Sequence, residues 1–201
     1  MVKRGIKKGL LCLLVSVMAL TCVSCGSQEK DDDIVSEKSL ETFTVTIPEN
    51  FFAFTNSEAE DTVKGYEGYC VDSKLENGNV VLELTEVQKD NLISMNEQFI
   101  QDTLEEFSNE NNLYTYELDE DYKKIIYSFD EKLGDTNPVL LGKVLMGVTS
   151  MHVLNGILET GNSEWNIEMV IKNCHTGHVV AQGTLPEGNL RFDAAEWEAS
   201  Y

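Results

Sequence analysis

The sequence predicts an α+β domain, an antiparallel sheet with about two helices packed on one face. Three observations indicate this class. Several short segments alternate apolar and polar residues, two longer stretches repeat apolar residues at three and four positions, and short turns separate the segments. Strand-like segments outnumber helical ones and are joined by hairpin turns, which is typical of antiparallel pairing. Since globular domains span about 50 to 250 residues, the 201 residues suit one such domain.

Residues 1–24 have the order of an export signal. Basic residues precede an apolar core from Leu10 to Leu20, and small residues follow. This core is shorter than the roughly 20 residues that a spanning helix needs. Residues 23–27, Val-Ser-Cys-Gly-Ser, resemble the lipobox of bacterial lipoproteins. The resemblance implies that Cys25 is acylated (palmitate is a typical chain), becomes the mature N-terminus and anchors the protein in the cell membrane on the extracytoplasmic face.

Three alternatives to lipidation at Cys25 stay open. Cys22, which stands where the family usually has leucine, is a second candidate for acylation. Cleavage without lipidation and a retained anchor are the other two. Residues 25–40 are polar and acidic, so they predict a lipidated cysteine followed by a flexible linker. Residues 41–201 then form a single extracytoplasmic α+β domain.

The charge excludes whole classes of partner. The chain has 35 acidic and 15 basic residues, a net charge of −20, and loss of residues 1–24 leaves 11 basic residues and a charge of −24. Nucleic-acid binding requires a basic surface, as does electrostatic binding to anionic lipid. We therefore expect no nucleic-acid partner. Contact with the bilayer is expected through acylated Cys25 alone, with an envelope protein as a possible further partner.

The first half of the domain predicts strands followed by a helix. Apolar side chains alternate in residues 41–48 and again in 80–87, and Asn77-Gly78 between them suits a hairpin turn. Residues 90–107 then have helical spacing, with Ser94 and Glu97 as a candidate capping box. Residues 113–118 and 122–129 predict a second hairpin around 119–121.

The second half predicts a long helix and two strands. Asn137 before Pro138 suits a helix start, and Gly161 is placed to end the apolar stretch. Polar residues within the stretch argue against a membrane span. Three glycines inside it predict close packing against the sheet: Gly142, Gly147 and Gly156. Residues 165–172 and 179–185 alternate as strands around a Thr-Gly turn, and a final helical turn carries Trp197.

The order of three strands, a long helix and further strands, opening with Phe-Thr-Val-Thr-Ile-Pro, resembles the PsbP-like fold over about residues 41–130. The stretch after Pro138 departs from that pattern. The resemblance implies a small scaffolding, binding or assembly protein and transfers no catalytic residue.

Residues 174–178, Cys-His-Thr-Gly-His, are the candidate for chemistry. Cys174, His175 and His178 are ligand types for zinc or copper, with His152 as a further candidate, although Thr-Gly equally suits a plain hairpin. Cys70 and Cys174 form either a disulfide or two separate thiols.

No catalytic motif emerges from the sequence, so we expect no catalytic residue, no cofactor and no established metal site. The sequence therefore predicts a membrane-anchored lipoprotein that is a non-catalytic ligand- or protein-binding module. The alternative is an exported metal-handling or hydrolytic domain that uses Cys174, His175 and His178.

Overall fold

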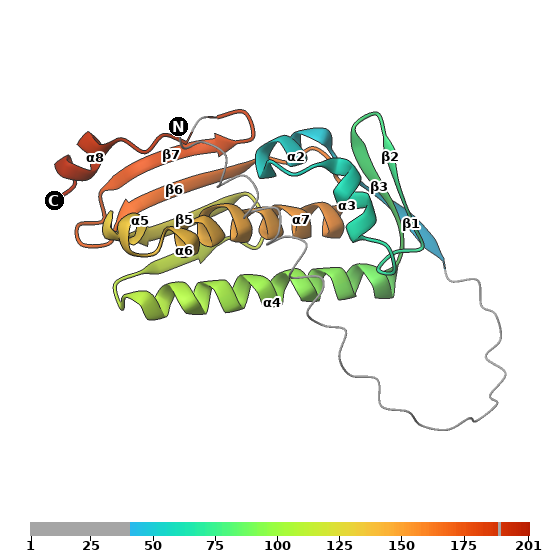
Figure 1. The fold of residues 1–201 in the computed structure, drawn as a ribbon, viewed down its shortest axis with the longest axis horizontal. Helices are drawn as coiled ribbons and strands as arrows, with labels where there is room; N and C mark the ends of the chain where they lie inside the picture. Colours follow the sequence, from blue (N-terminus) through green and yellow to red (C-terminus); the bar gives the residue numbers. More distant parts are fainter. Residues whose placement is uncertain (1–40, 189) are drawn as a thin grey trace, which may run out of the picture.

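A computed structural model of the protein describes residues 41–188 and 190–201. The predicted export signal, Cys25 and the acidic linker lie outside the described residues. The described part contains two β-sheets and several helices that share one hydrophobic core (Figure 1). The predicted α+β class is therefore confirmed.

The first sheet has three antiparallel strands in the order β1-β3-β2, namely β1 (Thr42–Ile47), β3 (Asn79–Thr85) and β2 (Asp72–Glu76). The predicted hairpin joins β2 to β3, with positive φ at Asn77 (52°) and Gly78 (84°). The predicted alternation is also confirmed, because five side chains of β1 and β3 are fully buried: Val45, Ile47, Val80, Leu82 and Leu84. Two short helices that the sequence did not predict, α2 (Glu49–Thr55) and α3 (Ala59–Gly65), lie between β1 and β2.

The long helix α4 (Glu86–Glu110) starts earlier than its apolar spacing predicted. Thr85, the last residue of β3, accepts a hydrogen bond from the Gln88 backbone N–H (3.2 Å), and its own N–H donates to Gln88 Oε1 (3.0 Å). This is a capping box. The capping box predicted at Ser94 and Glu97 is wrong, because those residues lie inside the helix.

The second sheet has four strands in the order β4-β5-β6-β7: β4 (Thr115–Leu118), β5 (Lys124–Phe129), β6 (Ile167–Asn173) and β7 (Val179–Leu185). The predicted hairpin of β4 and β5 is confirmed. In contrast to the expected single antiparallel sheet, β5 and β6 are parallel. The reason is the long helical connection between them, because a crossover helix returns the chain to the same end of the sheet.

That connection is one continuous helical stretch made of α6 (Pro138–Gly142), η1 (Lys143–Val148) and α7 (Thr149–Thr160), preceded by the short helix α5 (Lys132–Thr136). Its predicted ends are confirmed. Asn137 accepts from the Leu140 N–H (3.1 Å), and Gly161 ends the stretch at φ 66°. Among the described residues, this is the one helix long and apolar enough to cross a membrane, but 67% of its most apolar window is buried within the domain. Core packing therefore accounts for its composition.

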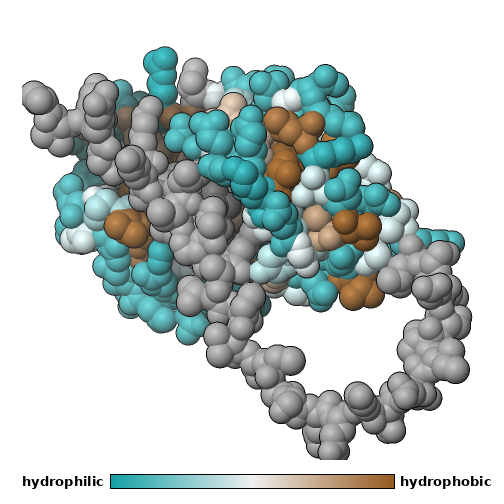
Figure 2. Space-filling model, turned by 45° about the vertical axis from the view of Figure 1, so that its right-hand side comes forward, coloured by the Kyte–Doolittle hydropathy of each residue, from teal (hydrophilic) through white to brown (hydrophobic). Residues whose placement is uncertain are grey.

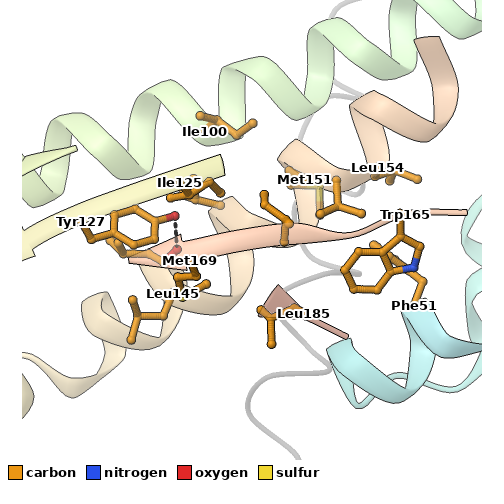
Figure 3. Close-up of a cluster of buried hydrophobic side chains, with 14 of the residues drawn as sticks. Phe51, Ile100, Ile125, Tyr127, Leu145, Met151, Leu154, Trp165, Met169 and Leu185 are labelled. Atoms are coloured by element: carbon orange, nitrogen blue, oxygen red, sulfur yellow. Dashed lines mark hydrogen bonds between the residues drawn. The ribbon is translucent and has the colours of Figure 1, made fainter. Parts of the chain in front are cut away.

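Side chains from both halves of the chain meet in one buried cluster (Figure 3). The Trp165 indole N–H donates to Asn50 Oδ1 (2.9 Å) and links α2 to the start of β6. Phe51 and Phe52 of α2 are buried members of this cluster, and Phe54 packs against it. The labelled members come from α2, α4, α7, η1, the strands of the second sheet and the segment before β6: Phe51, Ile100, Ile125, Tyr127, Leu145, Met151, Leu154, Trp165, Met169 and Leu185.

The final helix, α8 (Ala194–Ala199), confirms the predicted helical turn near the C-terminus. Asp193 caps it by accepting from the Ala195 N–H (2.9 Å). Trp197 is buried, and its ring centroid lies 5.7 Å from that of Phe129 at the end of β5. The helix thus covers the end of the second sheet where the β6–β7 turn lies.

Candidate functional sites

The β6–β7 turn carries the candidate cysteine and histidines. It is the tight hairpin that Thr-Gly predicted, with Gly177 at φ 75° and its N–H donating to the Asn173 carbonyl (2.8 Å). Asn173 is fully buried, and its Oδ1 accepts from the His175 N–H (2.9 Å). The side-chain amide of Asn173 also donates to Ser200 Oγ (2.7 Å). The backbone at His175 is therefore held by a buried side chain that is itself fixed by the C-terminal segment.

Parallel pairing of β5 and β6 brings a third ligand type to this turn. Phe129 and Asn173 are register partners, so the residues that follow them, Asp130 and Cys174, leave the sheet side by side. Ligand atoms of Asp130, Cys174 and His175 all lie within 4.8 Å of one another. We call these three residues the β5–β6 cluster.

Asp130 has a buried carboxylate with several donors around it. Oδ1 accepts from the Tyr114 hydroxyl (2.8 Å) and the Lys132 backbone N–H (3.1 Å), while Oδ2 lies 3.3 Å from His175 Nε2. Burial and then Asp130 raise the pKa of the Tyr114 hydroxyl, so Tyr114 stays a donor at neutral pH. The carboxylate is thus fixed in orientation, and Oδ2 faces His175.

Cys174 does not have the properties of a nucleophile. Burial and then the neighbouring Asp130 raise the pKa of its thiol, so the thiol is protonated at neutral pH. A nucleophilic cysteine requires the opposite shift. This observation disfavours the hydrolytic alternative at this turn.

The other predicted ligands lie elsewhere. His178 is exposed, and its Nε2 faces Glu196 at 4.0 Å. His152 lies inside α7 and faces Asp119. Both described cysteines are free thiols, so Cys70 and Cys174 form no disulfide. The Cys70 thiol, just before β2, donates a hydrogen bond to the Tyr66 carbonyl (3.2 Å). The structure thus brings Cys174 and His175 together with Asp130, which sequence reasoning missed.

A second candidate site is a pocket of about 620 Å³ between α4, α7 and the β4–β5 turn, which we call the α4–α7 pocket. Three carboxylates and two aromatic rings are among the side chains that line it: Glu97, Asp119, Glu120, Tyr122 and His152. Amides from Gln98, Gln101 and Asn155 add polar groups. None of the described residues that line the pocket is lysine or arginine.

His152 is the buried titratable group beside this pocket. Its Nε2 has no hydrogen-bond partner among the described residues, although Asp119 Oδ1 lies 3.5 Å away, within ion-pair distance. Burial lowers its pKa more than Asp119 raises it, so the imidazole is neutral at neutral pH. The Tyr122 ring lies against it, with centroids 4.9 Å apart. The pocket therefore has a net negative lining at neutral pH.

Two further contacts hold the pocket in shape. The buried Asn96 amide donates to Asn155 Oδ1 (2.8 Å) and joins α4 to α7. Tyr122 has a positive φ (58°), rare for a bulky residue, and its Cβ lies where a side chain at Gly156 would be. The predicted packing of the three glycines against the sheet is therefore wrong: Gly156 lies against the β4–β5 turn, Gly147 lies against Phe99 of α4, and an added Cβ at Gly142 would have nothing within 4 Å. No sequence signal marks this pocket, because its residues come from three separate segments.

The chain matches no protein-family model, no curated protein and no solved structure. The resemblances to bacterial lipoproteins and to the PsbP-like fold therefore stay predictions. The functional argument depends on the geometry of the two sites and on the N-terminal sequence.

Proposed function

We propose that this protein is a lipid-anchored extracytoplasmic binding module whose α4–α7 pocket takes a small ligand bearing amine or guanidinium groups. One observation carries the ligand class: three carboxylates and two aromatic rings line the pocket, with no lysine or arginine among its described lining residues. The predicted export signal and Cys25 support the anchoring. The acidic segment after Cys25 supports a flexible linker, which lets the domain extend away from the membrane.

The chemistry of the pocket favours a cation over an anion. Carboxylates attract an ammonium or guanidinium group, and a tyrosine face such as that of Tyr122 adds a cation–π contribution of about 0.5–1 kcal/mol at exposed sites. The net charge of −24 that remains after loss of residues 1–24 raises the local concentration of cations over the whole surface. An anionic ligand would be repelled by the pocket carboxylates and by the net negative charge of the protein.

The coloured part of the face in Figure 2 does not have the broad apolar patch of many protein-binding faces. On the face shown in Figure 2, the coloured surface is mainly hydrophilic, and the hydrophobic groups are separated from one another. Large apolar patches mark many protein-binding faces. This part of the surface therefore offers no support for an apolar contact with an envelope protein.

Replacing Cys25 by alanine is expected to move the protein from the membrane fraction to the soluble fraction, because the acyl chains supply the membrane affinity. Cell fractionation with immunodetection measures this, and intact-mass analysis detects the acyl chains. Cys22→Ala is the matched control and should stay at the membrane. Release of Cys22→Ala alone would place the lipid on Cys22, whereas retention of both variants would refute acyl anchoring through either residue.

Binding of putrescine, spermidine and arginine methyl ester to the purified protein, measured by calorimetry at low salt, tests the ligand class. Glu97→Gln is expected to weaken their binding by about 1.4-fold to fivefold, since one exposed ion pair contributes about 0.2–1 kcal/mol. Glu97 is preferable to Asp119, whose Oδ1 also accepts from the Lys123 and Lys124 N–H groups.

Glu105→Gln is the matched control, because Glu105 is exposed on α4 and does not line the pocket. Equal weakening by both variants would indicate a general charge effect and contradict binding at the pocket. Equal binding of glutamate, the anionic comparison, would contradict the ligand class.

A further inference from the structure

We propose that Asp130, Cys174 and His175 bind a divalent transition-metal ion of the zinc type. The proposal is independent of the α4–α7 pocket. It differs from the metal hypothesis based on sequence alone, because Asp130 takes the place of His178 and His152. The three side chains supply one carboxylate oxygen, one thiolate sulfur and one imidazole nitrogen, which are the three ligand types found in zinc sites. Cys174 releases its thiol proton to solvent when the ion binds, because the thiolate is the form that coordinates a metal.

The distances are close to those of a coordination sphere. Zinc–ligand bonds of about 2.0–2.3 Å in a tetrahedron place neighbouring ligand atoms about 3.3–3.8 Å apart. His175 Nε2 and Asp130 Oδ2 are already 3.3 Å apart. The remaining separations, at most 4.8 Å, need a contraction of about 1 Å. The His175 side chain is 38% exposed, so its rotation can supply this movement.

The carboxylate of one ligand and the backbone of a second are held in place before any ion arrives. The Tyr114 hydroxyl and the Lys132 N–H both bind Asp130 Oδ1, which leaves Oδ2 toward His175. Such hydrogen bonds to ligands orient metal sites. The Cys174 N–H donates to the Phe129 carbonyl (3.0 Å) and continues the β5–β6 ladder, so the cysteine backbone is fixed to the same strand end.

The charge of Asp130 also favours a cation. Its side chain is 4% exposed, and within the described part of the chain its ion pair is with His175. A buried carboxylate is costly unless a positive charge compensates it. A divalent ion would do so, and the partly exposed Cys174 and His175 leave a path from solvent. The carboxylate ligand favours zinc over the softer Cu(I) ion, which prefers thiolate and thioether ligands.

Titration of the purified protein with Zn²⁺, and separately with Co²⁺, tests this site. We expect one equivalent of zinc to bind and the midpoint of thermal unfolding to rise, because the ion joins the end of β5 to the β6–β7 turn. Cobalt should give a thiolate-to-metal charge-transfer band in the near ultraviolet, which carboxylates of the acidic surface cannot produce.

His175→Ala and Cys174→Ser are expected to lower zinc affinity at least about 100-fold, because losing even a hydrogen-bond partner of a ligand costs about 10–100-fold. His178→Ala on the same hairpin and Cys70→Ser at the other thiol should bind as the unmodified protein does. Absence of the cobalt band would overturn the proposal. Loss of binding in His178→Ala or Cys70→Ser, with retention in His175→Ala and Cys174→Ser, would equally overturn it.

Discussion

Replacing Phe107 by alanine is expected to lower the free energy of unfolding by about 3–5 kcal/mol, the cost of removing a buried aromatic side chain and leaving a cavity. Phe107 has no exposed surface. Its ring stacks on Tyr114 at 5.2 Å and meets Tyr127 and Phe129 edge-on at 6.4 and 6.3 Å. These rings come from α4, the residue before β4 and strand β5, so the substitution removes an aromatic contact between the helix and the second sheet.

Urea unfolding followed by circular dichroism measures this change. Val87→Ala is the matched control, because Val87 is on the same helix and is 64% exposed. Its effect should stay within about 0.5 kcal/mol, as for most surface substitutions. A loss below about 1 kcal/mol for Phe107→Ala would contradict the packing of α4 on the sheet.

Replacing Gly156 by alanine is expected to lower the free energy of unfolding by about 1–3 kcal/mol, although alanine is the better helix former. The added Cβ would lie 2.7 Å from Tyr122 Cβ. Tyr122 cannot easily yield, because the contact is at the base of its side chain and its backbone has φ 58°. The displaced Tyr122 ring would also change the α4–α7 pocket, so amine binding should weaken in the same variant.

Gly142→Ala is the matched control for this prediction. Gly142 is in the same helical stretch, and nothing lies within 4 Å of an added Cβ. The substitution should therefore raise stability by up to about 1 kcal/mol through helix propensity. In one denaturation experiment, the free energy of unfolding should fall for Gly156→Ala and rise for Gly142→Ala. Equal effects would mean that the contact between Gly156 and Tyr122 does not limit the packing.

The two sites differ in how they depend on the fold. The β5–β6 cluster comes from strand ends that are hydrogen-bonded to each other, so its backbone positions are well determined. The α4–α7 pocket depends on side-chain packing between two helices and a turn, with Asn96 and Asn155 as the buried polar link. Substitutions in the core should therefore disturb the pocket before they disturb the cluster.

The local sequence pattern was sufficient to predict an element wherever neighbouring residues alone determine its structure. The alternation in β1 and β3, the Asn77-Gly78 turn and the caps at Asn137 and Gly161 were all predicted, since each depends on a few adjacent residues. The helix of residues 138–160 was predicted for the same reason. The short helices α2 and α3 were missed because seven residues are too few to show a helical period.

Pairing between distant segments required the tertiary structure. Nothing in the local sequence shows that β5 and β6 are parallel, because the crossover helix sets their direction, yet this pairing places Asp130 beside Cys174 and His175. Likewise, Ser94 and Glu97 have the pattern of a cap, but Thr85 starts the helix because the chain passes directly from β3 into α4. The sequence by itself determined the α+β class, most of its strands and the acidic charge. Only the tertiary structure decided which polar groups meet, because the contacts that form both sites join residues far apart in the chain.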